Sequence, residues 1–419
     1  MLYVYKCMQG KLQNDWRSLI IFTLMIIMVG AIFYSRAILS ASIVAFTVVS
    51  FFHSRPKQHI RNFFSSPLLW GMSLLFFLPL LSGLWSEDKT EWQLMMFIKA
   101  PLFLLPLGFA GPVTISKRQW EWLAYIFILW VVWASIGSMF HYVNNAATVN
   151  EGYLRAKTMI TPLENDHVRF SWLVSIAILL MGSLYFQKRE DEQYAYWLLI
   201  VVASWLIIFL HILAARTGLI SFYIMLTGLL VWVIIKRSKY SIVLLAILIV
   251  LPFVAYKTLP TFHNRIQYFL YDFEYFKKTN YLPGANDAVR IISIKAGWNA
   301  MQQQPLTGAG FGDVISETKK YYNESYPQMI EADKIYPSSE FIMYGAGSGW
   351  PGLIVFIFAM TTPFFTKTKN KVVWWLLNIT AAFSLLFDPG LEVQFGVFIY
   401  SFMVLWCWKW FSVKNSETV

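Results

Sequence analysis

Residues 217–235 read TGLISFYIMLTGLLVWVII, and residues 240–256 read YSIVLLAILIVLPFVAY. Neither stretch contains a charged residue. As a helix rising about 1.5 Å per residue, each is long enough to cross the roughly 30 Å hydrocarbon core of a bilayer. The two stretches therefore predict membrane-spanning helices joined by a short connection.

Similar apolar stretches recur along the whole chain. We expect twelve transmembrane helices, at residues 17–35, 37–52, 67–85, 94–112, 120–140, 168–186, 194–213, 217–235, 240–256, 341–366, 371–387 and 391–411. The composition agrees, because 57% hydrophobic and 14% charged residues in a chain of 419 exceed what a water-soluble surface could bury. The predicted fold is all-α and polytopic. Its expected parts are helices 1–9 in residues 1–256, a long loop in residues 257–340, and helices 10–12 with a tail in residues 341–419.

The orientation follows from the cations of the short connections. They occur in every second connection, at Arg55, Lys117, Lys188, Lys236 and Lys367 among others. By the positive-inside rule these loops, and with an even helix count both termini, face the cytoplasm. The net charge of +11 thus reflects membrane topology. No basic stretch resembles a nucleic-acid module, so a nucleic-acid partner is not expected.

Two long connections fall on the predicted outer side, at residues 142–167 and 257–340. Connections of that length are rare unless they serve as lids or binding elements. The second is long enough to contain helices of its own. We therefore expect the functional residues to gather on the outer side, largely in residues 257–340.

Three neighbourhoods combine charged residues with small ones. LAARTG at 213–218 places Arg216 at the outer junction of two apolar helices, where a cation is costly unless it faces a cavity or a partner. Arg290 precedes a glycine-rich turn, PLTGAGFG, at 305–312. PSSEFI at 337–342 and GWPGL at 349–353 open the tenth predicted helix.

In this order and spacing, and with KAPLFLLPL at 99–107, these motifs resemble the bacterial O-antigen ligase and O-antigen polymerase family of membrane glycosyltransferases. The resemblance implies an inner-membrane fold of the GT-C type with a periplasmic site in the long, partly helical loop. It implies transfer of a glycan from undecaprenyl diphosphate to the next lipid-linked repeat unit or to lipid A-core, in lipopolysaccharide or exopolysaccharide biosynthesis. The implied partners are the glycan donor, the acceptor and membrane lipids. The motifs do not separate ligase from polymerase.

The chain departs from the family at one position. Where many members have His-Asn, it has Ser338-Ser339, and that His is usually proposed to activate the acceptor hydroxyl. Because serine cannot act as a base near neutral pH, either another group does so or catalysis relies on positioning and charge stabilisation. Glu340 is the nearest substitute, with His167, Asp166 and His263 as further candidates. The alternative for Ser338, Ser339 and Glu340 is a helix N-terminus with a serine cap.

The chemistry of the leaving group directs the remaining assignments. A diphosphate carries at least two negative charges, and arginine offers bidentate donors to phosphate at every relevant pH. Arg216, Arg290 and Glu340 are the expected catalytic residues. The expected substrate-binding residues are Arg265, Lys99, Ser338, Ser339, His167, Arg169 and His211. Lys99 could instead extend its ammonium to the membrane interface, and His211 could be a hydrogen-bonded interior histidine.

Other features limit the alternatives. Asp388 and Glu392 flank Pro389-Gly390, a pattern typical of a solvated turn. We find no Asp-x-Asp pair, no nucleotide-binding glycine loop and no His or Cys cluster with metal spacing, so neither a metal nor a cofactor is expected. A lipid-linked oligosaccharide flippase remains an alternative, although the two halves show no repeat. A non-catalytic component of polysaccharide export is another, favoured by the missing His.

Overall fold

A computed structural model of the chain describes residues 2–112, 115–155, 157–186, 193–279, 281, 283–284 and 286–412. Side chains are described for these residues except 2–15, 193–196, 278–279 and 286. Within the described ranges all regular structure is helical. The expected cytoplasmic cation Lys188 and the C-terminal residues 413–419 lie outside the described residues.

The helices follow one another along the chain with few long gaps. They are α1 (Leu2–Ala31), α2 (Arg36–Phe51), α3 (Pro56–Ser65), α4 (Pro67–Ser82), α5 (Lys89–Lys99), α6 (Pro101–Phe109), α7 (Lys117–Asn144), α8 (Ala146–Tyr153), α9 (Pro162–Asn165), α10 (His167–Phe186), α11 (Gln193–Leu213), α12 (Arg216–Ile235), α13 (Tyr240–Thr258), α14 (Pro260–Thr279), α15 (Asn286–Gln303), α16 (Val314–Ser325), η1 (Glu331–Asp333), α17 (Glu340–Thr361), η2 (Thr362–Phe365), α18 (Lys371–Leu386), η3 (Gly390–Glu392) and α19 (Gln394–Ser412).

The predicted apolar stretches all overlap helices of the structure. Among the described residues, seven helices are long and apolar enough to cross a membrane, or eight if α2 and α3, bent by 116°, form one span. Four further apolar helices are shorter: Trp16–Ala31 in α1, α4, Trp197–Leu213 in α11, and α18. The chain is thus a multi-pass membrane protein, while the count of twelve spans stays a prediction.

Helix α13 shows most clearly why a bilayer is needed. Ile242, Ile249 and Phe253 of this helix are 74%, 62% and 63% exposed. Ala255 is its one buried residue. A helix that is apolar all round and this exposed is stable only when hydrocarbon surrounds it.

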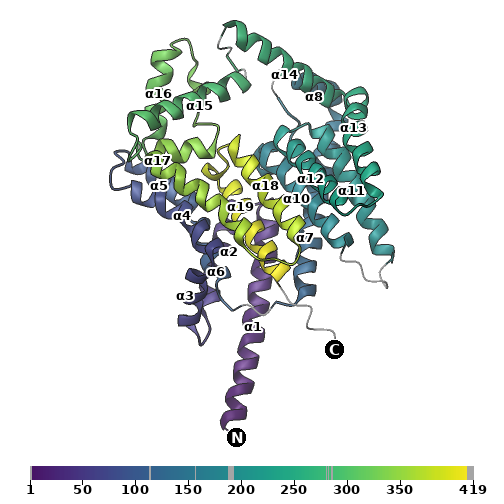
Figure 1. Cartoon of the computed structure of the whole chain (residues 1–419), viewed down its shortest axis with the longest axis vertical. Coiled ribbons are helices and arrows are strands. Elements are labelled where there is room, and N and C mark those ends of the chain that lie inside the picture. Colours follow the sequence, from purple (N-terminus) through teal and green to yellow (C-terminus); the bar gives the residue numbers. More distant parts are fainter. Residues whose placement is uncertain are drawn as a thin grey trace.

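The long loop forms the end of the molecule opposite the chain termini. Figure 1 shows the start of α1 and the end of α19 at one end, with α14, α15 and α16 at the other. Helix α14 packs on α8 and α13, and α15 packs on α16 and α17. The predicted helical content of residues 257–340 is therefore confirmed. Its periplasmic location and the division into three parts stay predictions.

The two glycine motifs dock on each other. Helix α17 is broken at Ser348 and Gly349, where Gly349 has φ +66°. The backbone N–H of Ala309 donates to the Ala346 carbonyl at 2.8 Å, and that of Trp350 donates to the Pro305 carbonyl at 2.8 Å. A Cβ at Gly349 would lie 2.4 Å from the Pro305 oxygen, so a side chain there would collide. The PLTGAGFG turn thus fixes α15 and α16 against the break in α17.

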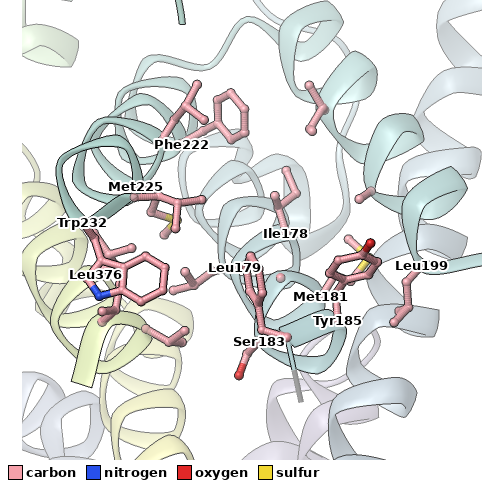
Figure 2. Close-up of a pocket in the computed structure, with 18 of the residues that line it drawn as sticks. Ile178, Leu179, Met181, Ser183, Tyr185, Leu199, Phe222, Met225, Trp232 and Leu376 are labelled. Carbon is pink, nitrogen blue, oxygen red and sulfur yellow. The ribbon is translucent and has the colours of Figure 1, made fainter. Parts of the chain in front are cut away.

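An apolar pocket of about 370 Å³ lies elsewhere, among α10, α11, α12 and α18. Figure 2 shows Ile178 and Leu179 of α10 and Phe222, Met225 and Trp232 of α12 around this space. The lining contains no charged residue, and it uses the later parts of α10 and α12. It is therefore separate from the charged groups at the starts of those two helices.

Candidate functional site

Lys99, at the end of α5, lies in a buried cluster with two carboxylates. Its ammonium nitrogen is 2.6 Å from Glu392 Oε1 and 3.5 Å from Glu340 Oε1, and it donates to the Leu391 carbonyl at 3.1 Å. The rings of Phe311 and Tyr344 lie 5.0–5.4 Å from it. The side chain is fully buried, so the alternative that it extends to the membrane interface is wrong.

Glu340 is the first residue of α17 and is also fully buried. One carboxylate oxygen faces Lys99 and the other accepts from the Leu391 backbone N–H at 3.0 Å. Ser339 occupies the N-cap position, but its side chain makes no capping hydrogen bond. The carboxylate therefore joins α5 and the η3 turn to the start of α17.

The turn at Pro389-Gly390 is not solvated, contrary to the sequence interpretation. The Glu392 side chain is 6% exposed beside Lys99. Asp388 is 6% exposed and pairs with Arg169 at 2.5 Å. Burial raises the pKa of Asp388, and the Arg169 charge opposes that rise. Arg169 also donates to the Pro389 carbonyl at 3.3 Å, so it ties α10 to this turn.

Arg216 begins α12 directly after a tight turn. Ala214 has φ +48°, and the Tyr153 hydroxyl donates to the Leu213 carbonyl at 2.7 Å. These contacts hold the turn, so the guanidinium points to the start of α15, where it forms an ion pair with Asp287. Arg216 also lies 5.0 Å from the ring of Phe269 on α14.

Arg265 on α14 lies in the same cluster and is 9% exposed. Burial, then the charge of Arg216, lowers the pKa of Arg265, and Arg290 adds to the effect. Three guanidinium groups from α12, α14 and α15 are thus close enough to repel one another. Such an arrangement is stable only with counter-charge.

The protein supplies only part of that counter-charge. Among the described residues, Arg265 Nε and Nη1 and Arg216 Nη2 are buried without a hydrogen-bond partner. One oxygen of Asp287 and one of Asp272 are also buried without a partner, while the other Asp272 oxygen accepts from the Asp287 N–H at 3.0 Å. Burial raises the pKa of Asp272. The arginine cluster, by which we mean Arg216, Arg265 and Arg290, therefore keeps open donors.

Residues 202–357 match the family model described as O-antigen ligase. This part of the chain is therefore similar to the O-antigen ligase family. No curated protein matches the chain. The family implies a glycosyltransferase that acts on lipid-linked glycans.

The matched range, residues 202–357, contains the arginine cluster and Glu340. Lys99, Arg169 and Glu392 come from outside that range, so the helices before and after the match complete the site. The serines at the family's His-Asn position lie inside it. The Ser338 N–H donates to Ser293 Oγ at 3.0 Å, the two hydroxyls are 2.9 Å apart, and the Ser293 hydroxyl donates to the Arg290 carbonyl at 2.8 Å. PSSEFI is thereby tied to the helical turn that carries Arg290.

The two histidines that the sequence predicts as substrate-binding residues differ in burial and in hydrogen bonding. His211 is buried, and its ring nitrogens lie 2.7 Å from the Ile207 carbonyl and 2.7 Å from the Tyr223 hydroxyl. This geometry favours the interior-histidine interpretation. His167, at the start of α10, is partly exposed, contacts the Asn165 backbone, and lies in the field of Arg265 and Arg290.

Sequence reasoning missed three carboxylates of the site. Asp287 pairs with Arg216, Asp272 meets the start of α15, and Glu392 pairs with Lys99. Asp287 could have been found, because it stands three residues before Arg290 and therefore on the same face of a helix. The others depend on contacts between distant segments.

Proposed function

We propose that this protein is a glycosyltransferase that moves a glycan from undecaprenyl diphosphate to an acceptor hydroxyl at the periplasmic face of the bacterial inner membrane. The acceptor is the next lipid-linked repeat unit or lipid A-core. The observation that carries the proposal is the set of buried, unpartnered N–H groups on Arg216 and Arg265 beside Arg290. Guanidinium groups bind phosphate through paired hydrogen bonds, so a diphosphate would supply the missing acceptors.

In the proposed reaction, negative charge develops on the leaving diphosphate next to this cluster. The acceptor oxygen forms a bond to the anomeric carbon, and the bond from that carbon to the diphosphate oxygen breaks. The lipid diphosphate leaves with the electron pair, while the hydroxyl proton passes to a base or to water. The arginines stabilise the charge that grows on the leaving oxygen, and the N-terminus of α12, which begins at Arg216, contributes in the same direction.

Glu340 fits a positioning role better than the role of general base. A base must come within hydrogen-bond reach of the acceptor hydroxyl, but both Glu340 oxygens are engaged and the side chain is fully buried. His167 fits the role of base better. It is partly exposed near Arg265 and Arg290, and its contact with the Asn165 backbone would orient the ring.

Purified protein incubated with lipid-linked glycan tests the function directly. An enzyme yields longer or transferred glycan together with free undecaprenyl diphosphate, whereas a flippase or a scaffold yields neither. Arg265→Gln and Arg290→Ala should each lower transfer by about a hundred- to a thousand-fold, since each removes donors to the developing charge. Arg290→Lys should rescue poorly because an ammonium lacks the planar fork.

Arg155→Ala is the matched control, because Arg155 lies on the other long connection, residues 142–167, and has a side chain that is 72% exposed and paired with Glu151. It should keep normal transfer. Normal transfer by both Arg265→Gln and Arg290→Ala, at wild-type protein level, would refute the assignment of the diphosphate site.

A further inference from the structure

A groove of about 360 Å³ lies between α15 and α16, and its lining begins four residues after Arg290. It is lined by Ile294, Lys295, Trp298, Asn299, Gln302 and Tyr321. All but Tyr321 come from one face of α15, and Tyr321 faces them from α16. The groove therefore lies in the same helical segment as Arg290.

The lining combines aromatic rings with amides. Trp298 is 39% exposed, Gln302 is exposed and Asn299 is half-buried. Asn299 Oδ1 accepts from the Gln303 amide at 3.0 Å, which leaves the Asn299 N–H donors for another partner. Rings of this kind stack on the C–H face of a sugar, and amides bind its hydroxyls. A purely lipid-facing patch would have no use for the amides.

The groove begins one helical turn after Arg290. Ile294, Trp298 and Gln302 follow it at intervals of four residues, so they continue along neighbouring parts of the helix surface. At 1.5 Å per residue, Trp298 is about 12 Å along the axis from Arg290. The opposite face is closed, since Ser293 bonds to Ser338 and Gly297 packs on Pro337.

We infer that this groove binds the glycan of the lipid-linked substrate, with sugar rings against Trp298 and Tyr321 while the diphosphate lies at the arginine cluster. The inference rests on the proposed function and adds to it the part of the surface that holds the sugars. A ligand leaving the arginines along α15 meets aromatic and amide side chains in succession, as a chain of sugars requires.

The test uses the oligosaccharide released by mild acid from the host's own lipid-linked glycan, which lacks the lipid and the diphosphate. Its binding to the purified full-length protein is measured by calorimetry or by saturation-transfer NMR. Trp298→Ala should weaken binding by about tenfold, which is about 1.4 kcal/mol, and Trp298→Phe should keep most of it because a ring remains. Trp122→Ala is the matched control, since Trp122 is 52% exposed on α7 away from the groove.

Trp298 also packs on Trp350, with ring centroids 5.6 Å apart, so its removal could disturb α17. Gln302→Ala avoids this problem and should also weaken binding severalfold. Equal binding by wild type, Trp298→Ala and Gln302→Ala overturns the inference. Arg290→Ala separates the two proposals: it should lower transfer by about a hundred- to a thousand-fold while the free oligosaccharide still binds.

Discussion

Replacing Lys99 by Met removes the only cation of a buried cluster without changing its volume greatly. In the native structure the Lys99 ammonium nitrogen lies 2.6 Å from Glu392 Oε1 and 3.5 Å from Glu340 Oε1, and the three side chains are 0–6% exposed. Breaking a buried pair by removing one partner costs about 3–5 kcal/mol, because the remaining charge has no compensation. With two carboxylates left behind, we expect the upper end of that range.

Glu340→Gln should cost far less. The shorter contact between Lys99 and Glu392 persists, and the Gln oxygen can still accept from the Leu391 N–H. The loss is then mainly one charge-assisted contact, or about 1–2 kcal/mol. If Glu340 is a positioning residue, transfer by the folded fraction stays within severalfold of wild type.

Denaturant unfolding of the purified variants, with the transfer rate measured per folded molecule, provides the assay. Glu151→Gln serves as control, because that carboxylate lies on the connection at residues 142–167 with a side chain 60% exposed. The reasoning is refuted if Glu340→Gln keeps full stability yet loses about a hundred- to ten-thousand-fold in rate, with recovery as the pH rises. That result would identify Glu340 as the general base.

Three further predictions concern topology, backbone and metal. Lys319 is 42% exposed on α16. The variant Lys319→Cys should react with an impermeant maleimide in cells whose outer membrane is permeabilised and whose inner membrane is intact. Reaction only after the inner membrane is broken would contradict the predicted orientation. Gly349→Ala should destabilise the fold by about 1–3 kcal/mol, because an alanine there would need a positive φ and its Cβ would collide with Pro305. Gly137→Ala should not destabilise the fold, because the space around its Cβ position is open. Transfer should persist in excess EDTA, and recovery only on adding a divalent cation would show that the reaction needs a metal.

The helices could be predicted from the sequence because hydrocarbon imposes a simple rule on spanning segments. Residues 217–235 and 240–256 became α12 and α13 with ends shifted by few residues. Breaks were harder to foresee. Predicted helix 341–366 contains the break at Gly349, and the segment at 94–112 is divided into α5 and α6 at Pro101. Such breaks depend on which backbone groups a neighbour can satisfy, which is tertiary information.

The arginines could be predicted from residue chemistry, but their partners could not. Arg216 at a helix junction is conspicuous because a cation is costly there. Lys99 and Glu392, in contrast, are 293 positions apart, and Glu392 follows a Pro-Gly pair that ordinarily forms a solvated turn. Only packing of α5 against the η3 turn converts that turn into a buried anion.

The two charged clusters differ in what completes them, and this difference supports the proposed position of the ligand. Around Lys99 every donor of the ammonium meets a protein acceptor, although Glu392 Oε2 is buried without a hydrogen-bond partner. The cation is thus fully paired and can hold α5, α17 and η3 in place without a ligand. The arginine cluster is more exposed, since 27% of the Arg216 side chain is accessible, yet single N–H groups of Arg216 and Arg265 are buried without a partner. A fold that leaves buried cations incompletely paired loses stability unless an anion binds them. Stability lost at the arginines, beside a fully paired cation at Lys99, is the expected pattern when the first cluster binds substrate and the second only positions it.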